Sequence, residues 1–243
     1  MLPFVKKGIA ESKAGNPQGT IANFVPERLG QTVVEYYNYD QTRYSEGRVN
    51  SLSELAEMRK FDGITWLCFF GLGDVDMLRQ TAEVYGINPL SIEDILNPDH
   101  RPKLEEFDKY LLLIVKMIDI GEDGRLISEQ VSFVVGENYV LTFQERPGDV
   151  LDPIRERLRK NIGRVRAMAS DYLALSLIDV IIDNYFVVLE SMASELEQLE
   201  IALLKSPDGF EGREVHELKM QLFYMRKISW PLRELASALL RSE

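Results

Sequence analysis

Residues 110–145, YLLLIVKMIDIGEDGRLISEQVSFVVGENYVLTFQE, contain three strand-like runs that are joined by two short turn signals. The runs cover residues 110–120, 126–135 and 139–145 and are dominated by aliphatic and aromatic side chains. The joining segments GEDG and GEN are rich in residues that favour tight turns. The stretch therefore predicts an antiparallel meander of three strands.

Upstream of this meander, strand-like and helical patterns alternate. TVVEYYNY (32–39) is β-branched and aromatic, and ITWLCFF (64–70) is a short apolar run, so both are predicted strands. SLSELAEMRK (51–60) is a short helical pattern, and GLGDVDMLRQTAEVYG (71–86) predicts a helix capped by Asp74 and ended by Gly86. Alternation followed by a meander predicts an α/β (α+β) fold with a mixed, largely antiparallel sheet.

Downstream of the meander, the patterns are helical. DVLDPIRERLRKN (149–161) predicts a helix that tolerates Pro153 in its first turn. Residues 170–204 predict a single helix of about 50 Å, at 1.5 Å per residue. SPDGF (206–210) predicts a loop, residues 211–227 a second helix, and WPLRELASALLRSE (230–243) the start of a third. Together they suggest a long helical hairpin, and the chain is expected to be truncated within its last helix.

Composition excludes several classes of function. The formal net charge is −11, from 39 acidic and 28 basic residues, which argues against nucleic acid as a partner. Cys68 is the only cysteine, so neither an internal disulfide nor a cysteine-based zinc cluster is expected. No signal peptide is predicted, and Asp179 and Asp183 interrupt the most apolar stretch, so the sequence predicts a soluble chain without a membrane span.

The stretch SIEDILNPDHRPK (91–103) places two carboxylates, Glu93 and Asp94, side by side on a short helical segment. One explanation is structural: Ser91 and Asp94 fit a capping box, and both acids would face the positive end of the helix dipole. The other explanation is that the two carboxylates bind a cation, which requires further acids within reach. Both explanations stay open at this point.

Further acids occur on the long predicted helix. The 38 residues between Arg166 and Lys205 contain no Lys, Arg or His, but they contain seven acids, namely Asp171, Asp179, Asp183, Glu190, Glu195, Glu197 and Glu200. Asp179 and Asp183 share one helix face among apolar neighbours, so we expect them to be partly buried and to need a partner. That partner is either an arginine from RERLRKNIGRVR (155–166) or a divalent cation.

The donor types indicate which cation such acids would bind. A set of ligands made of carboxylate oxygens, with no Cys in it and only two His in the whole chain, suits hard cations such as Mg²⁺ or Ca²⁺. No EF-hand loop is present, and Mg²⁺ needs only one or two carboxylates, so Mg²⁺ fits better. The chain also lacks a Walker loop, a G-x-S-x-G motif and an H-E-x-x-H motif.

Several stretches together resemble the cytoplasmic domain of CorA-type magnesium transport proteins. They are SIEDILNPDHRPKLEEFDKYLLLIVKM, SEQVSFVV, VLTFQERPGDVLDPIRERLR, DYLALSLIDVIIDNYFVVLE and ISWPLRELASALLR. The likeness runs from about residue 85 to the end of the chain. It implies an αβα sandwich followed by long antiparallel helices, in a homopentameric, funnel-shaped Mg²⁺ channel that also passes Co²⁺ or Ni²⁺. Such proteins are transporters, so no enzymatic activity is expected.

The resemblance also implies a domain organisation and a location. It divides the chain into a flexible lead-in (1–30), an α/β sandwich (31–166), an acidic pair of willow-type helices (167–228) and the start of a stalk helix (229–243). The family's two membrane spans and its Gly-Met-Asn signature would follow residue 243. The chain is therefore expected on the cytoplasmic face of the cell (inner) membrane, as the regulatory part of an integral membrane protein.

In this family, Mg²⁺ binds between neighbouring protomers and holds the pore closed. The resemblance assigns Asp94 to a first regulatory site, Glu93 and Asp179 to a second, and Asp183 as an additional candidate. Co²⁺ or Ca²⁺ are expected to substitute for Mg²⁺. The first site would be completed by an acid on the neighbour's stalk helix, beyond residue 243.

Two rival functions belong to other classes. The four acids Glu93, Asp94, Asp179 and Asp183 could surround two metal ions in a metal-dependent phosphohydrolase. Alternatively, the chain could be a metal-free scaffold that assembles through its helical arm. The hydrolase is disfavoured because no phosphate loop or catalytic histidine accompanies the acids.

Overall fold

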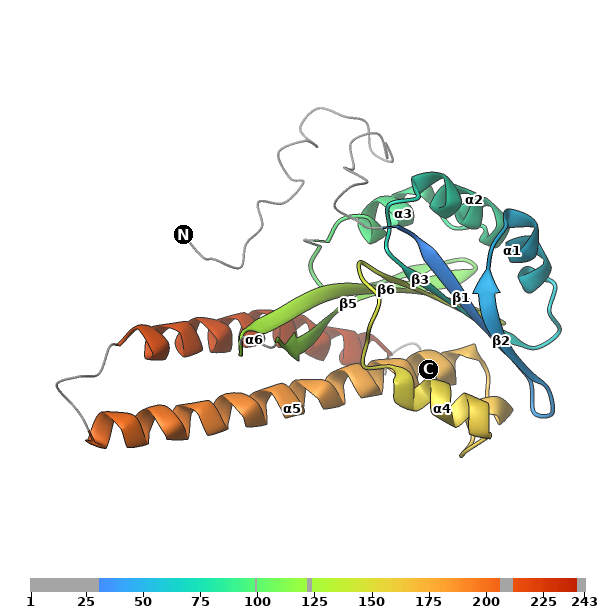
Figure 1. Ribbon diagram of the computed structural model, residues 1–243. Helices are drawn as coiled ribbons and strands as arrows, with labels where there is room; N and C mark the ends of the chain where they lie inside the picture. The colour runs from blue at the N-terminus through green and yellow to red at the C-terminus, as the bar shows by residue number, and fades with distance from the viewer. Residues whose placement is uncertain (1–30, 99, 122–123, 206–211, 240–243) are drawn as a thin grey trace, which may run out of the picture.

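The computed structural model describes residues 31–98, 100–121, 124–205 and 212–239, with the backbone alone for residues 233–239 (Figure 1). The predicted flexible lead-in (1–30) and the predicted loop SPDGF (206–210) lie outside the described residues.

The described residues form seven strands and six α-helices. The strands are β1 (Val33–Tyr39), β2 (Tyr44–Val49), β3 (Ile64–Phe70), β4 (Lys103–Phe107), β5 (Tyr110–Ile120), β6 (Leu126–Gly136) and β7 (Tyr139–Gln144). The helices are α1 (Leu52–Arg59), α2 (Val75–Tyr85), α3 (Pro89–Ile95), α4 (Asp152–Lys160), α5 (Ser170–Lys205) and α6 (Arg213–Leu239).

All seven strands form one sheet in the order β2-β1-β3-β7-β6-β5-β4. Only β3 and β7 run parallel, and the other neighbours are antiparallel. The predicted meander is β5, β6 and β7, and its second turn is closed by the pair Gly136 and Tyr139. The prediction of a mixed, largely antiparallel sheet is therefore confirmed.

Helices cover both faces of this sheet (Figure 1). Successive side chains of a strand point to opposite faces. On β3, Leu67 and Phe69 pack in the cluster that contains α1, α2 and α3, whereas Trp66 and Cys68 pack in the cluster that contains α4, α5 and α6. The expected αβα sandwich is confirmed, and its sheet separates α3 from α5.

Local signals place α1 and α2 where the sequence predicts them. Ser51 caps α1 by accepting a hydrogen bond from the Glu54 N–H. Asp74 caps α2 through Oδ1, which accepts from the Met77 N–H at 2.9 Å. Gly86 then ends α2 with a φ of 69°, a left-handed conformation that glycine adopts without steric cost.

Helix α5 is one continuous helix, as predicted, of 36 residues and about 54 Å. Its buried side includes Leu177, Ile181 and Tyr185, and the Tyr185 hydroxyl donates to the Lys116 carbonyl of β5. By length and composition α5 is also long and apolar enough to cross a membrane, which differs from the expectation that its aspartates exclude a span. Of the most apolar 18-residue stretch of α5, 33% is buried in the structure. Packing on the sheet accounts for this buried part.

Helix α6 runs without a break through the position where the sequence predicts a third helix. Pro231 lies inside α6, where a proline removes one backbone hydrogen bond. The Ser229 hydroxyl, two residues earlier, donates to the Met225 carbonyl within the preceding turn. The prediction of a separate helix from residue 230 is wrong, because the flanking turns keep the helix continuous across the lost bond.

Two strands, β2 and β4, escape the sequence prediction. They are the two edge strands of the sheet. Their sequences, YSEGRV and KLEEF, are mostly polar, and four of the six β2 residues are exposed. Charged side chains on edge strands hinder pairing with another chain, and they also remove the apolar alternation that identifies a strand.

Candidate metal centre

Helix α3 carries Glu93 and Asp94, but it does not begin where the sequence predicts. Asn88 is its N-cap, with Oδ1 accepting from the Leu90 N–H at 2.9 Å, and Pro89 is its first residue. Ser91 is buried within the helix, with its hydroxyl 2.8 Å from the Tyr110 hydroxyl. The predicted capping box of Ser91 and Asp94 is therefore wrong.

The earlier start moves both acids to the last turn of α3. Glu93 and Asp94 therefore do not meet the positive end of the helix dipole, which was the structural reason for placing them together. Since helix capping does not explain these two carboxylates, their position has to be explained by their contacts.

The end of α3 is tied to the sheet by two buried side chains of β5 and β6. The Gln130 amide Nε2 lies 3.2 Å from the carbonyl oxygens of both Asp94 and Ile95. Lys116 Nζ donates to the Pro98 carbonyl at 2.5 Å. These bonds hold the end of α3 and the segment after it against the sheet, and they fix the place from which Asp94 projects.

The Asp94 carboxylate contacts two basic groups that follow it in the sequence. Lys103 Nζ lies 2.7 Å from Oδ2, and His100 Nε2 lies 3.2 Å from Oδ1. Burial tends to raise the pKa of Asp94, but the hydrogen bonds from His100 and Lys103 outweigh it and leave this pKa lowered. The same contact with Asp94 raises the pKa of His100. Asp94 is therefore ionised at neutral pH.

Asp179 and Asp183 lie on the exposed side of α5, four residues apart. Within the described residues, neither carboxylate forms an ion pair. The expectation that both are partly buried is wrong, because the apolar neighbours Leu177 and Ile181 turn towards the sheet and leave the aspartates outside.

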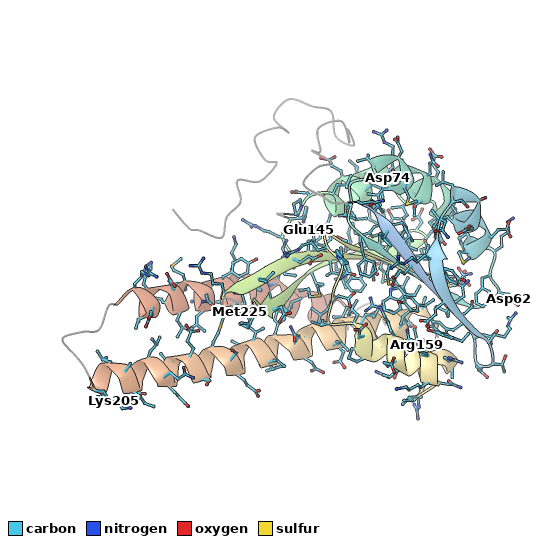
Figure 2. All side chains as sticks on the ribbon, in the orientation of Figure 1. Asp62, Asp74, Glu145, Arg159, Lys205 and Met225 are labelled. Carbon is cyan, nitrogen blue, oxygen red and sulfur yellow. The ribbon has the colours of Figure 1, made fainter. Side chains whose placement is uncertain are left out.

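The basic segment 155–166 pairs elsewhere. Arg155 binds Asp149 at 2.6 Å, and Arg159, labelled in Figure 2 on α4, binds Glu46 at 2.7 Å. Arg166 Nε donates to the Leu158 carbonyl at 2.6 Å. These arginines are therefore not the partners of the α5 aspartates, and of the two explanations open from the sequence, internal ion pairing does not apply to Asp179 and Asp183.

The structure does not bring the four predicted acids together within one chain. Glu93 and Asp94 belong to the helical layer on one face of the sheet, and Asp179 and Asp183 belong to the layer on the other face (Figure 1). Within the described part of the chain, no group of three or more His, Cys, Asp or Glu residues could hold a metal ion. Each pair can therefore supply only some of the ligands of a cation.

The donor chemistry nevertheless fits a hard divalent cation. All four side chains offer carboxylate oxygens, which are the ligands that Mg²⁺ prefers, and Mg²⁺ keeps several waters. Sequence reasoning missed the residues around these acids, namely Lys116, Gln130, His100 and Lys103. The last two lie in the quoted stretch SIEDILNPDHRPK, where basic residues that closely follow the acids are the available signal.

Comparison with known proteins identifies a family. Residues 61–243 match the family described as CorA-like Mg²⁺ transporter protein. The chain is 38% identical over 231 residues to the cobalt/magnesium transport protein CorA of Thermotoga maritima, and the match covers 95% of this chain and 66% of that protein. The chain thus spans just under two thirds of this curated relative.

Solved structures show the same fold. The complete CorA magnesium transporter of Methanocaldococcus jannaschii superposes with a TM-score of 0.64 at 19% identity, over 85% of this chain and 62% of that one. The ZntB cytoplasmic domain of Vibrio parahaemolyticus superposes with a TM-score of 0.63 at 12% identity, over 88% of this chain and 81% of that one.

Proposed function

The chain belongs to the CorA-like Mg²⁺ transporter family, and from this premise we propose that it is the cation-sensing regulatory domain of a divalent-cation channel. The cation would be Mg²⁺, with Co²⁺ or Ca²⁺ able to take its place, in keeping with the cobalt/magnesium transport activity named for the Thermotoga relative. The transported ions would be Mg²⁺ and also Co²⁺ or Ni²⁺.

One observation carries this proposal: Asp179 and Asp183 are exposed carboxylates without an ion pair among the described residues, on a helix segment with seven acids and no base. A like-charged surface of this kind costs free energy unless cations or a basic partner approach it. Because Glu93 and Asp94 lie across the sheet, a cation that uses both pairs has to lie between two copies of the chain. This arrangement supports the proposal that these four acids form intersubunit sites.

Gating would use the difference in cation affinity between two states of the assembly. A cation held between neighbouring subunits favours the arrangement in which the acids face each other, which is the closed state. A fall in Mg²⁺ removes this bridge, and repulsion between the acidic surfaces then favours the open state. The shift can be no larger than the difference in binding free energy between the two states.

The assembly would be a homopentamer on the cytoplasmic face of the cell membrane. The Vibrio ZntB structure with the same fold is a cytoplasmic domain, which supports this location. The chain would reach the membrane through spans that follow residue 243, and neither a nucleic acid partner nor a catalytic activity is part of the proposal.

The arrangement of the acids also argues against the rival hydrolase. A two-metal hydrolase holds its ions about 3.5–4 Å apart, so its carboxylates must surround one cavity. The sheet separates the two acidic pairs of this chain, so one chain cannot form such a centre. The metal-free scaffold differs from the sensor in one measurable respect, which is the response to divalent cations.

Thermal unfolding of the chain in Mg²⁺ or Co²⁺ tests the proposal. We expect millimolar MgCl₂ to raise the melting temperature, because a ligand that binds only the folded state stabilises it. The double variant Asp94→Asn and Asp179→Asn should lose most of this rise.

The matched control is the double variant Glu190→Gln and Glu197→Gln, which removes two exposed charges from α5 outside the proposed sites and should keep the rise. A chain whose melting temperature does not respond to either metal would contradict the sensor. An equal loss of the MgCl₂-dependent rise in melting temperature in both double variants would show that this rise depends only on net charge.

A further inference from the structure

The Asp94 carboxylate is enclosed by basic groups on both oxygens. Lys103 Nζ is 2.7 Å from Oδ2 and His100 Nε2 is 3.2 Å from Oδ1, and all three side chains are only about one quarter exposed (23% for Asp94, 26% for Lys103, 25% for His100). Partial burial makes such a pair stronger than an exposed one, since less water screens the charges. A cation that approaches Asp94 therefore meets a basic group already in contact with each oxygen.

Lys103 is held in this place by the fold and by a second acid. It is the first residue of β4 and pairs with Ile114 of β5, so its backbone is fixed by the sheet. Its ammonium also lies 2.6 Å from Glu105 Oε2, on the same strand. The ammonium of Lys103 thus lies between the Asp94 and Glu105 carboxylates.

We propose that Lys103 is an internal counter-cation that a divalent cation has to displace from Asp94, so that Lys103 sets the metal concentration at which this site fills. The inference rests on the proposed function, because it takes Asp94 to be a cation ligand. It adds a residue that tunes the affinity of the site without coordinating the metal.

The contacts explain how the exchange can occur. A divalent cation bound to Asp94 Oδ2 would lie within a few ångströms of the Lys103 ammonium and repel it. Lys103 can then leave Asp94 and keep its contact with Glu105, whose side chain is 47% exposed. Metal can bind Asp94 only while Lys103 is away from it. The observed affinity for metal is therefore the intrinsic affinity multiplied by the fraction of time in which Asp94 is free of Lys103.

The first test removes the charge of Lys103 and keeps its aliphatic stem. In the Lys103→Met variant we expect the MgCl₂ concentration at half-maximal response to fall about tenfold. This concentration is measured by isothermal titration calorimetry and by the rise in melting temperature. The matched control is Lys109→Met, because Lys109 is exposed in the turn between β4 and β5 and its loss changes the net charge equally.

The second test acts in the opposite direction. In the Glu105→Gln variant, the Lys103 ammonium loses its alternative charged partner and should remain on Asp94 for longer. We therefore expect this variant to need a higher MgCl₂ concentration than the unmodified chain. Because Glu105 is exposed on an edge strand, this variant tests the inference even if Lys103→Met fails to fold.

The outcomes separate this inference from the proposed function. If the unmodified chain does not respond to MgCl₂, or Asp94→Asn leaves its response unchanged, the assignment of Asp94 as a ligand is wrong. If the response depends on Asp94 but Lys103→Met changes it no more than Lys109→Met does, the assignment stands and the counter-cation is refuted. A Glu105→Gln variant that binds MgCl₂ as the unmodified chain does would also refute it.

Discussion

At the scale of single residues, Glu129 is an unusual carboxylate. It lies on β6 and is only 5% exposed, with Oε1 accepting from the Arg146 N–H at 2.9 Å and Oε2 3.6 Å from Arg146 Nε. Burial is the largest influence and raises its pKa to about 7, and the charge of the neighbouring Glu145, labelled in Figure 2, acts in the same direction. Its contact with Arg146 lowers the pKa but does not offset burial.

Glu129 should make stability depend on pH. Its pKa is about 7 in the folded chain and about 4.5 when unfolded, so the folded state binds more protons between these values. Stability should therefore fall by up to about 3 kcal/mol as pH rises through this window. Glu129→Gln keeps the acceptor for Arg146 and removes the charge, so it should stabilise the chain at about pH 8 and have little effect near pH 4.5.

Urea unfolding of both proteins at the two pH values measures this difference. The unmodified chain contains many other titrating groups, so the informative quantity is the difference between Glu129→Gln and the unmodified chain. A difference that is equal at both pH values would mean that Glu129 does not titrate in this window.

Residue types at the candidate site could be predicted from the sequence, but their surroundings could not. The sequence itself shows the segment of the long helix that lacks basic residues, and it shows the adjacent acids Glu93 and Asp94. The start of α3 was misplaced because Ser91 and Asn88 are both good N-caps, and Pro89 decided between them by favouring the first helical turn. The contacts of Asp94 depend on the paths of residues 96–98 and 100–103, which no periodicity describes.

At the scale of elements, a buried ion pair joins α4 to the loop that precedes it, because Asp149 lies between β7 and α4. Arg155 is 7% exposed and forms two bonds of 2.6 Å with Asp149, while its guanidinium lies 5.3 Å from the Trp66 ring. The side chain of Asp149 is almost fully buried, whereas that of Asp152, the other acid on Arg155, is 81% exposed. The pair between Arg155 and Asp149 therefore fixes the guanidinium at the start of α4, where it packs on Trp66 of β3.

Breaking this pair from one side should be strongly destabilising. Asp149→Asn leaves the Arg155 charge buried without its main partner, and we expect a loss of about 3–5 kcal/mol in the free energy of unfolding. The double variant Arg155→Met and Asp149→Leu leaves no buried charge and should lose less than Asp149→Asn alone.

Asp152→Asn is the control, because an exposed ion pair contributes about 1 kcal/mol or less. Urea unfolding of these variants, and of the single variants Arg155→Met and Asp149→Leu, gives the free energies. A double variant as unstable as the sum of its single changes would show that the two residues do not act as a pair.

The elements themselves were predicted best where burial dictates the pattern. The interior strands β3, β5, β6 and β7 and the helices α2 and α5 have apolar residues at the spacing that their burial requires. The edge strands β2 and β4 lack that pattern, because one side of each has no neighbouring strand and its residues are largely polar. The continuous α6 was missed because Pro231 usually ends a helix but here interrupts only one hydrogen bond.

At the scale of the whole molecule, the sheet places the two acidic pairs on opposite sides of a chain that carries a net charge of −11. In the proposed function, one chain would therefore offer cation ligands to a neighbour on each side. Two chains that approach through these surfaces repel each other unless cations lie between them. In the proposed function, divalent ions would act in two ways, as a general screen and as specific bridges, and only the bridges require particular carboxylates.

Assembly of the chain should accordingly depend on divalent cations rather than on ionic strength. In sedimentation velocity experiments we expect millimolar MgCl₂ to increase the sedimentation coefficient, and NaCl at matched ionic strength to have a much smaller effect. The variant Asp179→Asn with Asp183→Asn should lose the response to MgCl₂, because it removes the exposed carboxylates of α5 that would bridge to a neighbour. The variant Glu190→Gln with Glu197→Gln removes the same charge from the same helix and should keep the response. If NaCl acts as well as MgCl₂, or if both double variants lose the response together, screening alone explains the assembly and the bridging role of Asp179 and Asp183 is wrong.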